Sequence, residues 1–144
     1  MATDYDDRTS LNTYRSVGAT LGIFCAIGMR GFADSLGGGA EGWALDLANP
    51  ERIKVVIDEV VKLYGGLDIL VNNAGISKHT LIDDDEFEEI WDRHLDILLR
   101  AHTRTIRAAL PHLRKSESGR IVNIASTEGL GATPETSPYT SAKH

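Results

Sequence analysis

Two short apolar runs, separated by a long amphipathic stretch, place the strongest constraint on how this chain can fold. Residues 67–71 (Leu-Asp-Ile-Leu-Val) and 121–126 (Ile-Val-Asn-Ile-Ala-Ser) have the length and aliphatic character of buried strands. Residues 83–115 between them carry apolar side chains at helical spacing, which predicts a long helix. A strand, a helix and a strand of these lengths form a right-handed parallel crossover. The sequence therefore predicts an α/β fold built on a parallel sheet.

A second strand and helix precede this unit. Residues 43–47 (Trp-Ala-Leu-Asp-Leu) predict a short strand. Asn49 is a favoured N-cap, Pro50 is a favoured first helical residue, and Gly65 is a favoured terminator. The apolar residues that recur at 3.6-residue spacing between these signals are Ile53, Val56, Ile57, Val60, Val61 and Tyr64. The helix is therefore predicted to bury one face on the sheet.

The long stretch of residues 83–115 carries its own start and stop signals. Asp83 and Glu86 have the spacing of a capping box, and further acidic residues follow in the first turn. Pro111 predicts a kink or a local end, because proline cannot donate a helical hydrogen bond. Its apolar stripe comprises Phe87, Ile90, Trp91, Leu95, Leu98, Leu99, Ile106, Ala109, Leu110 and Leu113.

Tyr139 and Lys143 are the residue pair most suggestive of chemistry. They stand four residues apart, so a helix would place them on one face. A lysine ammonium a few ångströms from a phenol favours the phenolate and lowers its pKa from about 10, which would make Tyr139 a proton donor and acceptor. Ser126, at the end of its predicted strand, would hold a substrate oxygen beside them. The alternative is a surface tyrosine and a surface lysine on a polar helix. If the pair stood alone in the sequence, this alternative would be favoured, because short motifs often match by accident.

Other residues accompany this pair at characteristic spacings. Residues 72–75 (Asn-Asn-Ala-Gly) follow the first buried strand, Ser126 lies thirteen residues before Tyr139, and Lys143 lies four after it. This combination resembles the short-chain dehydrogenase/reductase family, from about Gly42 to the last residue. The resemblance implies a Rossmann-like, doubly wound sheet, here incomplete. It also implies an oxidoreductase that moves hydride between NAD or NADP and an alcohol or carbonyl substrate, such as a 3-oxoacyl compound or another secondary alcohol.

The same resemblance assigns roles to individual residues. Tyr139 would be the general acid–base, Lys143 would lower its pKa and contact the nicotinamide ribose, and Ser126 would orient the substrate oxygen. The residues expected to line the cofactor are Gly18, Gly22, Asp46, Leu47, Asn73, Ala74, Gly75, Tyr139 and Lys143. Two of these assignments have structural alternatives of their own. Asp46 can equally cap a turn at a strand end, and the asparagines can tie neighbouring strands together.

The N-terminal part departs from the family pattern. Gly18 and Gly22 fit the spacing of a phosphate-binding glycine loop, but Phe24 stands where a third glycine is expected. A glycine-containing turn that enters a helix over residues 23–32 is an equal alternative. Only nineteen positions separate Gly22 from Gly42, which is too few for the segment that selects the cofactor. The preference for NAD or NADP is therefore unreadable.

A further departure concerns proton relay. Leu98 occupies the position at which the family carries an asparagine that distorts the helix and holds a water linked to the lysine. Leucine offers no amide, so a slower relay is expected. The five histidines lack metal-ligand spacing and are interpreted as helix-surface residues, so no metal site is predicted. Of these, His94 and His102, together with Arg100, would lie on the outer side of the helix of residues 83–115, through which a homo-oligomer is expected.

Composition bounds the remaining possibilities. A net charge of −6 and no cluster of basic residues argue against nucleic-acid or anionic-membrane partners. A single cysteine and an acidic N-terminus without a signal sequence predict a cytoplasmic protein. Residues 1–16 are interpreted as a flexible arm or poor edge strand, and residues 17–144 as a partial nucleotide-binding domain.

Two rival functions remain open at this stage. The chain ends one residue after Lys143, whereas family members continue, so a fragment of a longer protein or a shortened product is expected. Such a chain would be either an oxidoreductase or a catalytically inactive module for folding, oligomerisation or interaction. A flavodoxin-like nucleotide binder without redox chemistry is a third alternative.

Overall fold

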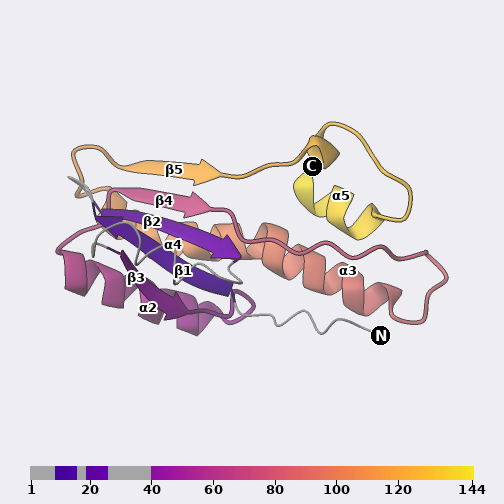
Figure 1. Cartoon of the computed structure of the whole chain (residues 1–144), viewed down its shortest axis with the longest axis horizontal. Helices are drawn as coiled ribbons and strands as arrows, with labels where there is room; N and C mark the ends of the chain where they lie inside the picture. The colour runs from indigo at the N-terminus through magenta and orange to yellow at the C-terminus, as the bar shows by residue number, and fades with distance from the viewer. Residues whose placement is uncertain (1–8, 16–18, 26–39) are drawn as a thin grey trace.

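A five-stranded sheet organises the protein. The computed structural model describes residues 9–15, 19–25 and 40–144, with side chains for Trp43 and residues 45–144 (Figure 1). The strands are β1 (Thr9–Arg15), β2 (Ala19–Cys25), β3 (Ala40–Ala44), β4 (Ile69–Asn72) and β5 (Arg120–Asn123), in the order β3-β1-β2-β4-β5. β2, β4 and β5 run parallel, whereas β1 is antiparallel to both of its neighbours. The predicted α/β class with an incomplete Rossmann-like parallel sheet is confirmed.

The helices are arranged around the parallel strands. They are α2 (Pro50–Tyr64), α3 (Phe87–Leu95), the π-helical η1 (Asp96–Arg100), α4 (Ala101–Leu113), the 3₁₀ turn η2 (Thr127–Gly129) and α5 (Ser137–Lys143). α2 packs against α4, α4 packs against β4, and α3 packs against α5. In Figure 1, α3 extends beyond the sheet, and α5 lies above α3. The two ends of the helical segment from α3 to α4 therefore pack differently: α4 packs into the core, and α3 packs against α5.

Helix α2 forms as its sequence predicts. The Asn49 side chain accepts a hydrogen bond from the Arg52 backbone N–H at 3.0 Å, and Pro50 follows as the first helical residue. Gly65 ends the helix with φ of 81°, a left-handed conformation in which glycine has no steric penalty. The buried face of α2 consists of Ile53, Val56, Ile57 and Val60. These side chains join the core with Leu45, Leu47, Leu67, Leu70, Ala74, Ala101, Ala109 and Leu113.

The N-terminal predictions need correction. Gly22 lies within strand β2, opposite Val71 of β4, so it is not part of a phosphate-binding turn, and residues 23–25 are not helical. Aliphatic and aromatic residues dominate this run, and parallel pairing with the buried strand β4 outweighs their weak helical period. Gly18 and residues 26–39 lie outside the described residues.

Strand β1 also differs from its prediction. Residues 1–16 were expected to form an arm or a poor edge strand, but Thr9–Arg15 pairs with β2 on one side and β3 on the other. Antiparallel pairing supplies backbone hydrogen bonds on both edges, which compensates for the few strongly apolar side chains of this strand. The strand predicted over residues 43–47 ends earlier, at Ala44.

The long helix begins later than predicted. Its first residue is Phe87, not Asp83, and no side chain caps it. The Asp84 carboxylate accepts hydrogen bonds from the Leu81 N–H at 2.8 Å and the Thr80 hydroxyl at 2.9 Å. These bonds stabilise a turn before the helix, so the acidic run does not act as a capping box. At the other end, α4 continues through Pro111 to Leu113.

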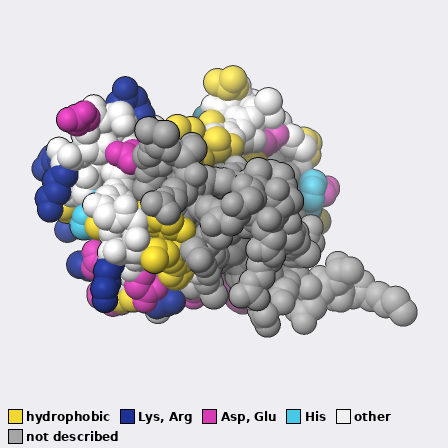
Figure 2. Space-filling model, turned by 60° about the vertical axis from the view of Figure 1, so that its left-hand side comes forward, with side chains coloured by type: hydrophobic (Ala, Val, Ile, Leu, Met, Phe, Trp, Pro, Cys, Tyr) yellow, Lys and Arg dark blue, Asp and Glu magenta, His cyan; other side chains and the backbone are white. Residues whose placement is uncertain are grey.

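The surface mixes charge and apolar exposure. Lys and Arg side chains lie along one side of the face in Figure 2, with acidic side chains among them. All four residues of β5 are exposed, Ile121 to 40% and Val122 to 42%. Leu130 is 93% exposed. Among the described residues, no helix has the length and apolar character needed to cross a membrane.

The Asn72 side chain fixes three elements to one another. It is 1% exposed, its Nδ2 donates to Asn123 Oδ1 of β5 at 2.8 Å, and its Oδ1 accepts from the Thr105 hydroxyl of α4 at 2.8 Å. Buried amides that satisfy both their donor and their acceptor specify one arrangement of the groups around them. The predicted role of an asparagine in tying neighbouring strands is thus confirmed at Asn72.

We predict that Asn72→Ala lowers the free energy of unfolding by about 2 kcal/mol, because it removes a buried side chain together with its hydrogen bonds to Asn123 of β5 and Thr105 of α4. Asn73→Ala is the matched control. Asn73 is only half-buried, so its truncation should cost about 0.5 kcal/mol or less. Urea denaturation followed by circular dichroism measures both values. Equal losses for the two variants would contradict the tying role of Asn72.

Candidate active site

Helix α5 brings Tyr139 and Lys143 together, as their spacing predicts. Lys143 Nζ lies 5.9 Å from the centre of the Tyr139 ring, within the range at which a cation and an aromatic ring attract. Both side chains are half-buried. Pro138 opens the helix and Ala142 is buried, so the helix turns its small apolar side chains inward. The predicted closeness of the pair is present, while the catalytic roles assigned to it remain predictions.

The Lys143 ammonium is anchored to the sheet. Its Nζ donates a hydrogen bond to the Ile124 carbonyl at 2.9 Å. The Ile124 N–H in turn donates to the Asn72 carbonyl at 2.9 Å, which extends the β4–β5 pairing by one bond. Lys143 is therefore held at the carboxyl ends of two parallel strands, where α/β sheets bind ligands.

Ser126 lies just beyond the same end of β5. Its backbone is extended, with φ of −148° and ψ of 159°, and its Oγ accepts a hydrogen bond from the Glu128 N–H at 3.2 Å. The serine thus acts as the N-cap of η2, and η2 packs against α5. In this bond the Ser126 oxygen is the acceptor, so the Ser126 hydroxyl proton remains available for donation to another oxygen.

Glu128 is a site residue that sequence reasoning missed. Its carboxylate accepts from the hydroxyls of Thr133 and Thr140, the latter at 2.7 Å, and from the Thr133 N–H at 3.0 Å. The bond from the Thr133 hydroxyl, followed by the Thr140 hydroxyl and the Thr133 N–H, lowers the pKa of Glu128 from 4.5 to about 2. Thr140 neighbours Tyr139, so the carboxylate fixes the helix that carries the tyrosine. The recurrence of threonine at 133, 136 and 140 was the available signal.

Gly129 was likewise missed, and it permits a close approach of two backbones. A Cβ added to this glycine would lie 2.5 Å from the Lys143 carbonyl oxygen, a distance that real Cβ atoms do not reach. Gly129 is the last residue of η2, and Lys143 is the last of α5. The absence of a side chain therefore sets how closely the end of α5 sits against the Ser126 turn.

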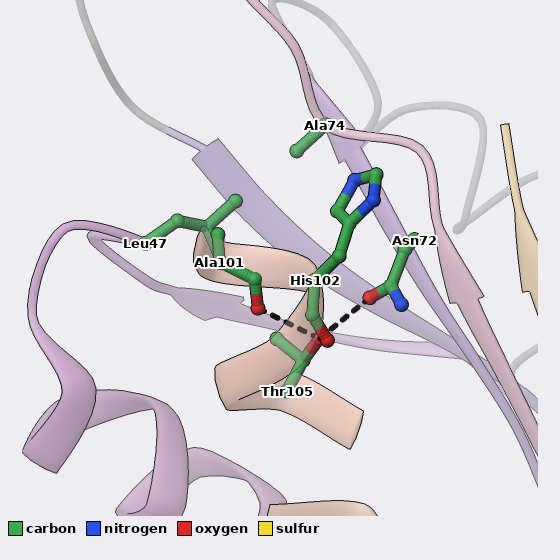
Figure 3. Close-up of a pocket in the computed structure, with 6 residues that line it drawn as sticks. All are labelled: Leu47, Asn72, Ala74, Ala101, His102 and Thr105. Carbon is green, nitrogen blue, oxygen red and sulfur yellow. Dashed lines mark hydrogen bonds between the residues drawn. The ribbon is translucent and has the colours of Figure 1, made fainter. Parts of the chain in front are cut away.

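A small hollow lies at the end of β4 on the side of α4 (Figure 3). It has no room for a water molecule, and it is lined by Leu47, Asn72, Ala74, Ala101, His102 and Thr105. His102 was expected on the outer side of the helix. Instead it is half-buried, and its ring lies beside Ala74 and Asn72 (Figure 3). The hollow therefore combines apolar walls with one ionisable side chain.

The His102 Nε2 is an orphaned polar atom. It is shielded from solvent and has no hydrogen-bond partner within the described part of the chain. Burial lowers the pKa of His102, and the nearby positive charge of Lys143 lowers it further. A buried ring nitrogen without a partner carries a cost in free energy, because its desolvation is not compensated.

The remaining predicted cofactor residues lie in different environments. Leu47 and Ala74 line the hollow, at 2% exposure each. Asp46 is exposed, and its carboxylate accepts from the Ala48 N–H at 2.9 Å, so the turn-capping alternative is present in the structure. Asn73 is half-buried beside the hollow-lining Ala74. Of the predicted set, Leu47 and Ala74 are thus brought to one cavity.

Leu98 and Gly75 are in contact across the loop that follows β4. Leu98 is 1% exposed within η1, and a Cβ added at Gly75 would lie 3.1 Å from its Cδ2. The π-helical turn forms although leucine replaces the asparagine that distorts this helix in the family. Leu98 fits here because residue 75 is a glycine. A side chain at residue 75 would compete with Leu98 for the same space.

The family assignment follows from a direct comparison. A family model described as short chain dehydrogenase matches residues 29–144. The chain belongs to the short-chain dehydrogenase family. The match begins at residue 29, after Gly18 and Gly22.

Individual relatives give the same family. The D-beta-hydroxybutyrate dehydrogenase of Rhizobium meliloti (strain 1021) is 40% identical over 120 residues, which cover 81% of this chain and 46% of that protein. The 3-oxoacyl-[acyl-carrier-protein] reductase of Thermotoga maritima is 32% identical over 77% of this chain and 45% of its own length. The chain thus spans less than half the length of each of these two relatives.

Solved structures show the same relationship in three dimensions. A short-chain dehydrogenase from Streptomyces avermitilis aligns with a TM-score of 0.71 and 32% identity, covering 80% of this chain and 42% of its own. The ligand-free aldohexose dehydrogenase of Thermoplasma acidophilum aligns with a TM-score of 0.67 and 34% identity, covering 71% and 40%. Over the aligned part of the chain, the fold is therefore that of the family.

We predict that acid weakens the anchoring of α5 through Glu128. Because the folded-state pKa lies near 2 and the ordinary value is 4.5, the carboxylate stabilises the segment above pH 4.5, and this is lost as the pH falls toward 2. Amide hydrogen exchange of α5 should therefore accelerate over this window, after correction for the intrinsic rate. In Glu128→Gln the acceleration should be absent. Glu117→Gln, at an exposed turn position, should behave as wild type.

We predict that Gly129→Ala displaces the C-terminal end of α5, because its new methyl group collides with the Lys143 carbonyl. Gly131→Ala is the matched control in the same turn. Its added Cβ would lie 3.9 Å from the nearest atom, the Thr127 carbonyl oxygen, an ordinary contact. Backbone NMR shifts of residues 137–144 should change in the first variant only. Equal changes in both variants would contradict the close approach.

Proposed function

We propose that this chain carries the catalytic half of an NAD(P)-dependent oxidoreductase that interconverts an alcohol and a carbonyl compound. The observation that carries this proposal is the placement of the Lys143 ammonium 5.9 Å from the Tyr139 ring centre, at the carboxyl ends of β4 and β5. Ser126 caps the turn that packs against the same helix. Membership of the short-chain dehydrogenase family supports this interpretation.

Residues at the end of β4 would contact a nicotinamide dinucleotide in this proposal. His102 Nε2, an orphaned nitrogen beside that strand end, is a candidate hydrogen-bond contact for the cofactor. Leu47 and Ala74 would contact the cofactor as well, with Asn73 and Gly75 along the path toward Lys143. Bound there, the nicotinamide cofactor supplies or accepts the hydride.

The protein residues would manage the proton and the oxygen. In oxidation, the substrate hydroxyl gives its proton to the Tyr139 phenolate as the carbinol C–H bond releases hydride and the C=O bond forms. In reduction, the Tyr139 hydroxyl returns a proton to the oxygen. The Lys143 ammonium would lie beside the reacting group, and Ser126 would donate a hydrogen bond to the substrate oxygen.

The proposed substrate class follows from named relatives. One is a D-beta-hydroxybutyrate dehydrogenase and another a 3-oxoacyl-[acyl-carrier-protein] reductase. Both names place the reacting oxygen on the third carbon of an acyl chain. We therefore propose a 3-hydroxyacyl or 3-oxoacyl substrate, with either NAD or NADP as cofactor. The cytoplasmic location also remains a proposal.

The rival function, a non-catalytic interaction module, uses the outer side of residues 83–115. His94 cannot contribute to that surface, because it is 1% exposed. Arg100 is 50% exposed at its side chain and pairs with Asp96 at 3.1 Å. Oligomerisation through this helical segment thus remains a proposal in which Arg100 takes part and His94 does not.

We predict that Tyr139→Phe reduces the oxidation rate of D-beta-hydroxybutyrate by roughly 100-fold or more, because the proton acceptor is removed. Reduced-cofactor fluorescence should show NADH or NADPH binding within about 2-fold of wild type, since the substitution removes only the phenol hydroxyl and leaves the other proposed cofactor contacts in place. Tyr64→Phe, at the end of α2, is the control that should turn over normally.

Two results would contradict the proposal. Binding without turnover in wild type and Tyr139→Phe alike would indicate a nucleotide binder without redox chemistry. The absence of any fluorescence change at millimolar NADH and NADPH would favour the interaction module.

A further inference from the structure

His94 occupies a buried position directly beside the proposed catalytic tyrosine. It lies on α3 and is 1% exposed, and its ring meets the Tyr139 ring edge to face. The ring centroids are 6.5 Å apart and the planes are inclined by 89°, an attractive geometry for aromatic pairs. Because α3 packs against α5, this contact joins the two helices at the residue that matters for proton transfer.

Both nitrogens of the His94 ring are engaged, and their partners fix its protonation state. Nδ1 lies 2.6 Å from the Ile90 carbonyl, which can only accept, so Nδ1 carries the proton. Nε2 lies 3.2 Å from the Lys78 backbone nitrogen, which donates, so Nε2 accepts. The ring is therefore the neutral Nδ1–H tautomer, and it bridges α3 to the loop that follows β4.

The charged surroundings of His94 favour the same neutral state. Burial lowers the pKa of His94, and the positive charges of Arg93 and Lys78 lower it further. The hydrogen bond to the Ile90 carbonyl acts in the opposite direction and raises it. The Lys78 ammonium itself pairs with Glu86 at 2.7 Å. Tyr139 faces the ring from α5. Protonation of Nε2 would oppose two N–H donors, so it would break the tie to Lys78.

The loop that His94 holds also contacts the start of α5. The Thr80 N–H, two residues beyond Lys78, donates to the Glu135 carbonyl at 2.9 Å. Glu135 adopts a φ of 65°, a conformation uncommon outside glycine, and it immediately precedes the N-cap of α5. His94 thus acts on Tyr139 along two routes, directly through the ring contact and indirectly through this loop.

We propose that His94 is a positioning residue for Tyr139, one that holds the phenol ring in its reactive orientation as a neutral aromatic wall. This inference rests on the proposed function, since it assigns His94 a role in that reaction. His94 is not a catalytic residue, because both of its nitrogens are occupied by the backbone and neither is available to substrate. A misplacement of about 1 Å at a reacting group can cost on the order of 100-fold in rate, so orientation alone is a sufficient reason for this contact.

The kinetic test compares two substitutions at one position. In His94→Ala, which removes the ring, we expect kcat for D-beta-hydroxybutyrate oxidation to fall roughly 10-fold to 100-fold, with KM for the cofactor within about 2-fold of wild type. His94→Phe keeps an aromatic edge toward Tyr139 but cannot accept the bond from the Lys78 N–H, so it should recover part of kcat. Ile90→Ala removes buried volume from the same helix without removing a ring, and kcat should be preserved in the folded fraction. Unchanged kcat in His94→Ala, or equal losses in all three variants, would overturn the proposal.

A second measurement does not depend on turnover. NMR of protein labelled at the tyrosine ring carbons and at the histidine ring nitrogens should show the Nδ1–H tautomer of His94 and an NOE between His94 and Tyr139. In His94→Ala the Tyr139 ring signals should broaden or shift, and in His94→Phe they should remain sharp. A Tyr139 signal that is the same in wild type and His94→Ala would overturn the positioning role. Should wild type show the contact but no turnover, the proposed function fails while the structural role of His94 stands.

Discussion

The hydrogen bonds of Asn72 connect the core of the protein to the candidate site. Its side chain joins β5 and α4, and its carbonyl accepts from the Ile124 N–H. The carbonyl of that same Ile124 holds the Lys143 ammonium. A continuous chain of bonds thus runs from the buried face of α4 to the proposed site. Because these hydrogen bonds are connected, the position of Lys143 depends on the core of the protein as well as on α5.

The part of the fold that sequence could predict is the part in which local signals and burial agree. Helix α2 is the best case, because Asn49, Pro50 and Gly65 mark its ends and its apolar stripe is the stripe that it buries. The closeness of Tyr139 and Lys143 followed from helical spacing in the same way. Such predictions need only the geometry of one element.

The failures come from positions at which partners distant in sequence decide the outcome. Gly22 suggested a turn, yet pairing with Val71 makes it part of a strand. His94 and His102 read as surface residues, although the loop after β4 buries the first and the hollow shelters the second. In each case tertiary contacts outweighed a local pattern that was itself weak.

The exposure of β5 makes the two halves of the site unequal in stability. On the described residues β5 pairs only with β4, and its side chains are open to solvent on both faces, whereas Leu70 and Ala74 at the end of β4 are deeply buried. Local opening free energies follow such differences in burial. A fluctuation that detaches β5, η2 and α5 would disperse Ser126, Tyr139 and Lys143 while it leaves Leu70 and Ala74 in the core.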